Sequence, residues 1–501
     1  MNAPLRRVGV VVMIMFGLLF ANLNWVQAYK AGEYRNSPYN SRVQIAEYQR
    51  ERGLILVGRD AQAVTGNVET DGRLRYQRTY PLAERYAHVV GYKPVNGEAT
   101  GIEWFENEFL AGTADTLFVD RLRDLFTEDS TPGGNVLTTL SAPAQQTAYE
   151  ELRDNRVGAR RGAVVALDPR TGAVQALVSM PSFDPNPLAS HDPDEVEAAY
   201  QELDEDPDKP LRNRALSERY PPGSVFKIID AAAALERGYT PQTAIPAGRT
   251  YQHPETTHVI NNAAPSVCPE PEVTLIEALT ESCNTAFAQL GVRYGAAELK
   301  EKARQFGFED EDLTVGRVNG DGMPVAASRT GDIANPDGTE DPAALAQSAI
   351  GQNNVRMTPL QGAMIAAAVA NGGRQMRPYL VQQLLGPDRT SSYYTVAPRE
   401  LRRSVSGQVA ADLQTMMVSV VERGTGRNAR ISGYTVGGKT GTAETGSRDD
   451  HGWFIGFVAK DGQPISAVAV LLENAGKGGS GEAARISREI MRAVIADRGG
   501  S

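Results

Sequence analysis

The strongest constraint on this chain is a set of three short motifs that lie far apart in the sequence. Each occurs once, in the order Ser224-Val225-Phe226-Lys227, Ser282-Cys283-Asn284 and Lys439-Thr440-Gly441. Together these motifs indicate one site for acyl transfer by a serine, provided that the fold brings the three segments together. The chain must therefore contain a domain large enough to place them around a common cleft. Its 501 residues, 41% of them hydrophobic, can bury such a core.

The first motif has the residues of an activated nucleophile. Pro221-Pro222-Gly223 blocks any helix upstream, so the pattern predicts a helix over Ser224–Arg237 with Ser224 in its first turn. Ser224 and Lys227 would then share one face of that helix. A neutral lysine can take the serine proton if its pKa falls from ~10.4 towards 7, a shift of about 4 kcal/mol. Burial and a second cation both lower a lysine pKa, and Lys439 is the candidate for that cation.

The third motif is predicted to lie on a strand. The segment Tyr434–Glu444 is too rich in glycine and threonine for a helix. In an extended chain Lys439 and Gly441 would point to one face, and Thr440 and Thr442 to the other. The edge of such a strand can dock an extended peptide by main-chain pairing.

The N-terminus predicts export. Arg6 and Arg7 precede an apolar run, Val8–Ala28, that reaches the ~20 residues needed to cross a bilayer, with the positive charge on the cytoplasmic side. The alternative is a cleaved signal peptide, because Val26-Gln27-Ala28 resembles a small-residue cleavage site. Both interpretations place the rest of the chain outside the cytoplasm.

The second motif contains one of the two cysteines. Thr274-Leu275-Ile276-Glu277 is a capping box, which predicts the start of a short helix that would end near Ser282. In an oxidising compartment Cys268 and Cys283 can form a disulfide, which would close roughly 15 residues and contribute ~3 kcal/mol. Two buried free thiols are the alternative.

Charge and histidine spacing argue against several other functions. The net charge of −10 does not favour nucleic-acid binding. We expect neither a metal nor a cofactor, because no ligand spacing relates the five histidines: His88, His191, His253, His258 and His451.

Two glycine-rich segments imitate nucleotide-binding motifs. Gly433–Thr440 matches the P-loop pattern, but no amphipathic helix follows it. Gly424–Ala429 imitates a dinucleotide fingerprint, but it follows a helix-like stretch instead of a strand. We therefore discard both.

Changes in composition and hydrophobic pattern along the chain predict three parts. Residues 1–29 would form a cytoplasmic tip and a transmembrane anchor, residues 30–155 a non-catalytic pedestal, and residues 156–501 the catalytic domain. The pedestal shows β-like runs, and after it the patterns predict a hairpin, two further strands and a final helix. The β-like runs are Leu54–Gly58, Tyr86–Val90 and Val136–Leu140, with a helix at Ala142–Leu152; the later elements are the hairpin Ala163–Ser179, the strands Trp453–Val458 and Ser466–Leu472, and the helix Gly481–Asp497.

With these motifs, the chain resembles a class B penicillin-binding protein, a monofunctional peptidoglycan transpeptidase. It is most similar to the actinobacterial penicillin-binding protein A group. Further segments typical of the family occur in their usual order: Arg52-Gly53-Leu54-Ile55, Gly101-Ile102-Glu103, Asp168-Pro169, Thr171-Gly172, Pro181-Ser182-Phe183-Asp184-Pro185-Asn186, Asn213-Arg214-Ala215, Ile350-Gly351-Gln352, Thr358-Pro359-Leu360-Gln361 and His451-Gly452-Trp453-Phe454. One departure is Cys283, where the family frequently has an aspartate.

The resemblance implies a fold and a role for each motif residue. It implies an α+β penicillin-binding, serine β-lactamase-like domain: an antiparallel sheet flanked by helices plus an all-helical part, after a membrane helix and a smaller, mostly β, pedestal or dimerisation-like domain. The resemblance implies Ser224 as nucleophile, Lys227 as general base, Ser282 as proton relay and Lys439 as a source of positive potential. It implies that Asn284 binds the donor amide and that Thr440 and Thr442 bind the terminal carboxylate. The segment Lys439-Thr440-Gly441-Thr442 would form the strand edge, and the backbone N–H groups of Thr442 and Ser224 would form the oxyanion hole.

The resemblance also implies substrates and partners. The donor would be a stem peptide that ends in D-Ala-D-Ala, and β-lactams would inhibit the enzyme covalently. A SEDS-family glycosyltransferase and division or elongation proteins in the same membrane would be partners. The alternatives that we keep are a D,D-carboxypeptidase, a β-lactamase-type hydrolase, and a non-catalytic penicillin sensor or division scaffold.

Overall fold

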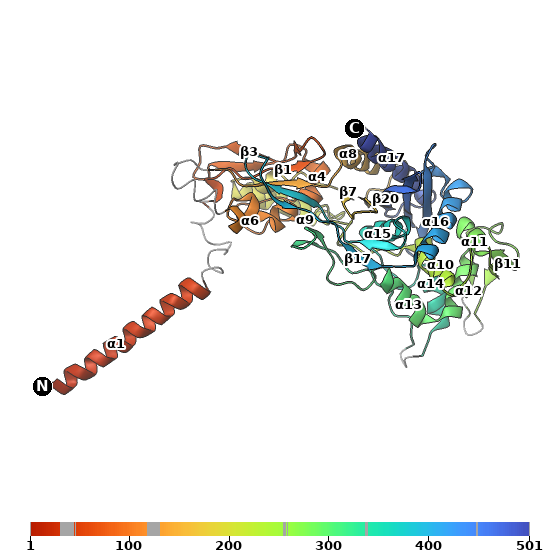
Figure 1. Cartoon of the computed structure of the whole chain (residues 1–501), viewed down its shortest axis with the longest axis horizontal. Helices are drawn as coiled ribbons and strands as arrows, with labels where there is room; N and C mark the ends of the chain where they lie inside the picture. The colour runs from red at the N-terminus through yellow and green to blue at the C-terminus, as the bar shows by residue number, and fades with distance from the viewer. Residues whose placement is uncertain are drawn as a thin grey trace.

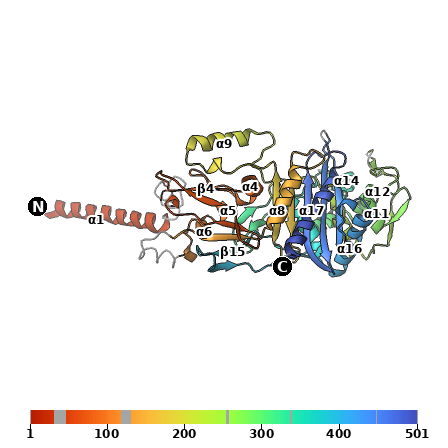
Figure 2. The ribbon, with the colours of Figure 1, turned by 90° about the horizontal axis from the view of Figure 1, so that it is seen from above.

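A five-stranded antiparallel sheet, here called the main sheet, forms the centre of the C-terminal part of the chain (Figures 1 and 2). The structure is a computed structural model that describes residues 2–30, 45, 47–117, 131–253, 257, 259–335, 339–446 and 449–499. The strand order is β18-β19-β20-β6-β7. The bounds are β6 (Gly162–Leu167), β7 (Val174–Met180), β18 (Thr435–Ala443), β19 (His451–Lys460) and β20 (Gln463–Leu472). The predicted hairpin and both later strands are confirmed within these elements.

Helices cover both faces of the main sheet because both faces are apolar. On one face α8 (Ala142–Arg153) and α17 (Gly479–Gly499) pack on alternate residues of the strands, and α17 contributes Ile486, Ile490 and Val494. On the other face lies α15 (Pro359–Ala370), in which every residue is buried. Alternation along each strand thus supplies two cores, one on each side.

The remaining helices form a largely helical part beside the edge strand β18. The predicted capping box is confirmed, because the Thr274 hydroxyl and the Glu277 carboxylate each cap the other residue's backbone N–H. Together with the main sheet, this part confirms the predicted α+β fold. The turn η3 (Pro187–Ala189) and helix α9 (Pro193–Glu205) lie apart from this helical part, against Ala87 and Tyr92 of the N-terminal part (Figure 2). Further elements between β7 and the end of the chain, outside the main sheet, are η4 (Gly223–Phe226), α10 (Lys227–Glu236), β8 (Ala244–Pro246), β9 (Thr250–Tyr251), β10 (Ile260–Asn261), β11 (Glu272–Thr274), α11 (Leu275–Glu281), α12 (Asn284–Tyr294), α13 (Ala296–Gln305), β12 (Thr314–Gly316), β13 (Gly322–Pro324), α14 (Pro342–Ala349), β14 (Arg374–Met376), β17 (Glu400–Arg403), α16 (Gly407–Glu422) and η5 (Arg427–Ala429).

A second five-stranded sheet, the small sheet, combines segments from distant parts of the sequence. Its order is β16-β15-β5-β1-β2, so strands from residues 381–395 complete a sheet begun near residue 55. Helix α8 conversely precedes residue 155 and yet packs on the main sheet. The small sheet and the elements around it are β1 (Ile55–Val57), β2 (Gln62–Ala63), β3 (Gly66–Glu69), β4 (Tyr76–Thr79), α4 (Ala83–Val90), α5 (Gly101–Phe105), α6 (Asn107–Leu110), η2 (Asp115–Leu117), β5 (Asn135–Thr138), β15 (Val381–Leu385) and β16 (Ser392–Thr395).

One β-like run of the sequence is a helix. Tyr86–Val90 forms the end of α4, not a strand. Its β-branched and aromatic residues favour a strand by composition. However, all five residues of this stretch are buried within the helix. Burial against the rest of the fold therefore outweighs the intrinsic preference.

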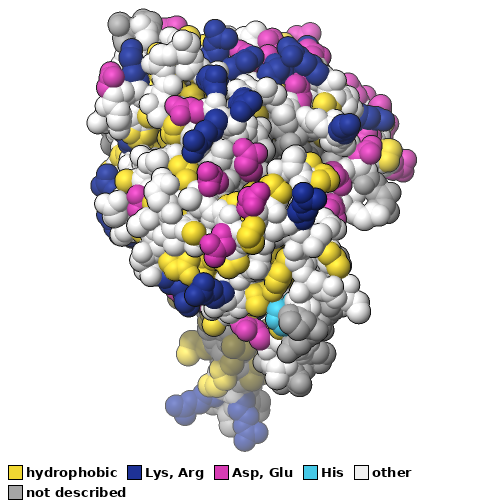
Figure 3. Space-filling model, turned by 90° about the vertical axis from the view of Figure 1, so that its right-hand side faces the viewer, with side chains coloured by type: hydrophobic (Ala, Val, Ile, Leu, Met, Phe, Trp, Pro, Cys, Tyr) yellow, Lys and Arg dark blue, Asp and Glu magenta, His cyan; other side chains and the backbone are white. Residues whose placement is uncertain are grey.

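The N-terminal helix is apolar and yet exposed along its length. Helix α1 (Asn2–Asn24) continues through a π-helical turn, η1 (Trp25–Tyr29). Over Arg6–Tyr29 it is the one helix of the described chain that is long and apolar enough to cross a membrane, and none of that stretch is buried. At the opposite end of the molecule, acidic and basic side chains lie interspersed on the surface (Figure 3).

Candidate active site

Ser224 lies in a tight turn that is wedged between two backbone segments. It belongs to the 3-10 turn η4, and α10 begins only at Lys227, so the predicted helix starts one turn later than expected. Gly223 has φ +52°, and a Cβ there would lie 2.2 Å from the Thr442 carbonyl oxygen. A Cβ on Gly351 would lie 2.1 Å from the Gly223 carbonyl oxygen. Side chains at either glycine would displace the turn that carries Ser224.

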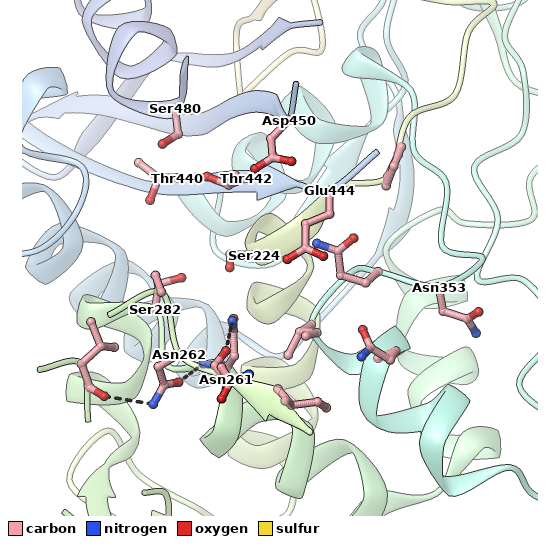
Figure 4. Close-up of a pocket in the computed structure, with 18 of the residues that line it drawn as sticks. Ser224, Asn261, Asn262, Ser282, Asn353, Thr440, Thr442, Glu444, Asp450 and Ser480 are labelled. Carbon is pink, nitrogen blue, oxygen red and sulfur yellow. Dashed lines mark hydrogen bonds between the residues drawn. The ribbon is translucent and has the colours of Figure 1, made fainter. Parts of the chain in front are cut away.

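Ser224 faces a cleft of about 1230 Å³ that segments of all three motifs line. Figure 4 shows Ser224 between Thr440 and Thr442 on one side and Ser282 and Asn262 on the other. The first side is the edge strand β18, and the second is the turn between α11 and α12 with its neighbouring loop. The fold thus brings the three motifs together around one hollow large enough for a peptide.

Lys227 is completely buried below this cleft. Its Nζ donates to the Ser282 carbonyl oxygen at 2.7 Å and to Asn284 Oδ1 at 2.7 Å, and it lies 3.3 Å from Ser282 Oγ. Burial lowers the pKa of Lys227 well below its usual range, and the charge of Lys439 lowers it further. Both causes favour a neutral amine, which is the state that a general base requires.

Lys439 reaches the same hydroxyl from the strand. It is fully buried, and its Nζ donates to Ser282 Oγ at 2.7 Å and to the Thr440 carbonyl oxygen at 3.1 Å. Burial lowers the pKa of Lys439 to about 7. Ser282 itself has φ +64° at the end of α11, a left-handed conformation that is uncommon outside glycine. The turn thus holds the Ser282 hydroxyl between two amines.

Asn284 is fixed at both ends of its amide. Its Oδ1 accepts from Lys227, and its Nδ2 donates to the Asn261 carbonyl oxygen at 2.8 Å. The Asn284 backbone N–H donates to Asn262 Oδ1 at 2.8 Å. The end of β10 and the residue after it, Asn262, therefore position the first residue of α12.

The threonines of β18 line the opposite wall. Thr440 Oγ1 shares a hydrogen bond of 2.5 Å with Thr425 Oγ1, and Thr442 lines the cleft two residues further on. Gly441, between them, faces the turn of the nucleophile: a Cβ there would lie 2.7 Å from the Pro222 carbonyl oxygen. This contact lets the Ser224 turn approach the strand edge closely.

A disulfide joins the two cysteines next to this site. Cys268 and Cys283 are bonded, with Cα atoms 6.1 Å apart, and Cys283 is fully buried. The bond ties the loop before β11 to the residue between Ser282 and Asn284. It thereby constrains the turn that presents both side chains.

We predict that Cys268→Ala lowers the free energy of unfolding only in oxidising buffer, by about 3 kcal/mol, because the bond restricts the unfolded chain. Thermal unfolding of both proteins with and without dithiothreitol measures this. In reductant the wild type should fall to the level of the variant. An equal loss in both buffers would mean that the packing of Cys268, and not the bond, is responsible.

Several residues at the site carried no signal of their own in the sequence. Asn261 and Asn262 lie outside the three motifs, and their spacing to Asn284 becomes meaningful only in the fold. Thr425 lies in the glycine-flanked segment that imitates a dinucleotide fingerprint. Among the described residues, no group of three or more His, Cys, Asp or Glu side chains could hold a metal ion. His258 lies outside the described residues.

Comparison with known proteins places this site in a family. Residues 162–492 match the penicillin binding protein transpeptidase domain, and residues 52–136 match the penicillin binding protein A dimerisation domain. The chain is 43% identical to the peptidoglycan D,D-transpeptidase PbpA of Mycolicibacterium smegmatis over 99% of both chains, and 43% identical to that of Mycobacterium tuberculosis over 99% of this chain and 98% of the relative. The solved imipenem acyl-enzyme complex of penicillin-binding protein A from M. tuberculosis is 43% identical, with a TM-score of 0.83 over 90% of this chain and 100% of that one. The chain therefore belongs to the class B penicillin-binding proteins.

Proposed function

We propose that this protein is a D,D-transpeptidase that crosslinks peptidoglycan stem peptides through a serine acyl-enzyme and that β-lactams inhibit it covalently. The observation that carries the proposal is the convergence of Lys227 and Lys439 on Ser282 beside the cleft that Ser224 lines. The names of the two PbpA relatives and the imipenem acyl-enzyme of penicillin-binding protein A from M. tuberculosis support the same activity.

In the proposed acylation, Ser224 Oγ attacks the carbonyl of the penultimate D-alanine while Lys227 takes its proton. The backbone N–H groups of Ser224 and Thr442 hold the oxyanion, and each such donor is often worth ~3 to 4 kcal/mol. The tetrahedral intermediate then expels terminal D-alanine, whose amine receives a proton through Ser282. The hydrogen bonds from Lys439 to Ser282, and between Ser282 and Lys227, support this proton path.

The substrate would lie along β18. Thr440 and Thr442 would bind the terminal carboxylate, with Thr425 orienting the Thr440 hydroxyl. Asn284 would hold the donor amide, with Asn261 and Lys227 fixing its own amide group. Gly441 would leave room for the Ser224 turn, and Lys439 would supply positive potential. An amine of a neighbouring stem peptide then attacks the ester, releases Ser224 and forms the crosslink.

The fate of the acyl-enzyme tests the transpeptidase against the two hydrolases. With a donor peptide that ends in D-Ala-D-Ala and an amine acceptor, we expect a crosslinked product. An enzyme that does not strongly activate water for deacylation keeps its acyl ester long enough for the amine to attack it. Mass spectrometry of the products measures the ratio of crosslinked to hydrolysed peptide. After penicillin labelling, free enzyme should return slowly. Rapid turnover of the drug would identify a β-lactamase instead, and hydrolysed peptide alone a carboxypeptidase.

The arrangement of the chain supports a proposed division of labour. Residues 1–29 would anchor the protein with its N-terminus in the cytoplasm, supported by the apolar stretch Arg6–Tyr29. The pedestal would begin at residue 30, and we move its proposed end from residue 155 to Ser141, because α8 packs on the main sheet. Strands β15 and β16 would return to it from the catalytic domain.

For partners, we propose a SEDS-family glycosyltransferase in the same membrane, together with division or elongation proteins. A transpeptidase needs glycan strands that another enzyme polymerises, and the proposed anchor would hold it beside such an enzyme. Co-purification from membranes, with an anchor-deleted variant as control, tests this partnership.

A further inference from the structure

Asp230 is a buried acid that the mechanism above does not use. It lies on α10 three residues after Lys227, so the two side chains share one face of the helix. Asp230 is 0% exposed, and neither of its carboxyl oxygens has a hydrogen-bond partner. Aspartate is almost never fully buried without a partner, because a carboxylate in such a place costs several kcal/mol.

The positive charge of Lys227 lowers the pKa of Asp230, although neither Asp230 oxygen is hydrogen-bonded to Lys227 Nζ. From α12, Tyr294 faces the same space, and its hydroxyl is likewise buried without a partner. Within the described residues, no charged group of α11, α13 or α16 acts on the Asp230 carboxyl. The other charged groups of α10 form ion pairs with α13 at the far end of the helix: Arg237 with Glu298, and Glu236 with Lys302.

Burial and attraction act on this pair in opposite directions. Burial raises the pKa of Asp230 well above its usual range, whereas burial and then the positive charge of Lys439 lower the pKa of Lys227. Both effects favour the neutral acid beside the neutral amine. The charge of each group, in contrast, stabilises the opposite charge on the other. Each group therefore influences whether the other carries a proton.

The hydrogen bonds of Lys227 fit both of its protonation states. A neutral amine has two N–H donors, which the bonds of 2.7 Å to Ser282 O and Asn284 Oδ1 use, and its lone pair can accept from Ser282 Oγ at 3.3 Å. An ammonium group would donate all three, and its charge would lie 5.7 Å from the centre of the Phe287 ring.

We propose that Lys227 and Asp230 hold a single proton between them in the resting enzyme, so that Asp230 is a positioning residue that sets the fraction of Lys227 available as base. With the proton on Asp230, Lys227 is neutral and can accept the Ser224 proton. With the proton on Lys227, the amine is occupied and Asp230 is its counter-ion. The inference rests on the proposed role of Lys227 in acylation and adds the acid that controls it.

The pH dependence of acylation tests this proposal. In Asp230→Asn no negative charge stabilises the ammonium form, so neutral Lys227 becomes more abundant in acid. We expect the ratio of the acylation rate at about pH 5.5 to that at about pH 8.5 to rise about tenfold, the equivalent of one pKa unit. The rates are second-order constants for a fluorescent penicillin, measured on the full chain in detergent. Asp230→Thr is a second neutral variant, whose hydroxyl can bond to the preceding helical turn.

The matched control is Glu236→Gln, which removes an acid from the same helix two turns further on. It should leave the ratio at the wild-type value. A folded Asp230→Asn or Asp230→Thr protein with the wild-type ratio would overturn the proposal, since Asp230 would then be neutral throughout. A wild type that penicillin does not label would instead overturn the proposed function, and this inference with it.

Discussion

Replacing Ser224 with alanine abolishes acylation by penicillin, with the rest of the cleft unchanged. We expect this complete loss because, among the side chains that line the cleft, Ser224 alone is presented on the η4 turn against the β18 edge. Removing the Ser224 hydroxyl leaves the packing of Gly223, Gly351 and Gly441 around the turn intact. A fluorescent penicillin, followed by gel electrophoresis and intact-mass measurement, reports the covalent adduct.

Ser282→Ala is the matched control for that experiment. It removes a second hydroxyl that lines the same cleft, but the proposed role of this residue is that of a proton relay and not of the nucleophile. We expect slow labelling in Ser282→Ala and none in Ser224→Ala, at similar melting temperatures. A mass adduct on the Ser224→Ala protein would move the nucleophile to another residue and remove the basis of the proposed chemistry.

The parts of the fold that the sequence predicted are those where a local pattern decides the structure. The capping box at Thr274 and the short apolar run Trp453–Val458 each specify an element without reference to distant residues, and both are confirmed. The proximity of the three motifs was predictable for a different reason: a serine needs a base, and a buried amine needs hydrogen-bond acceptors, so the motif residues have a chemical reason to meet.

The features that the sequence did not predict depend on contacts between distant segments. Strand β15 joins the small sheet through Val381 and Leu384, which pair with Thr138 and Val136, and no local pattern specifies such a partner. The role of Asn262 arises only where its side chain accepts from the backbone of Asn284. Asp230 could not be singled out beforehand, because the sequence does not reveal that all sides of α10 are covered.

Replacing Lys227 with methionine should lower the rate of acylation by about 10²- to 10⁴-fold, the usual contribution of a general base. Methionine fills a similar volume without a charge, so the fully buried position tolerates it better than a shorter side chain. The substitution leaves the Ser282 carbonyl oxygen and Asn284 Oδ1 without their donor, which costs about 1–3 kcal/mol of stability for a buried group. It also removes a buried amine, which offsets part of that loss.

The pH profile separates the loss of the base from a general disturbance of the site. A lysine with a lowered pKa is neutral, and able to accept a proton, above that lowered value, and it loses this ability as the pH falls through it. Acylation of the wild type should therefore decline in acid, whereas the residual rate of Lys227→Met should lack this decline. Lys302→Met is the matched control, because Lys302 is also buried but pairs with Glu236 away from the cleft. If Lys227→Met acylates at the wild-type rate with the wild-type pH profile, Lys227 is not the base. Lys439 then becomes the candidate base, because its pKa of about 7 also permits a neutral amine and its hydrogen bond to Ser282 gives it a path to Ser224.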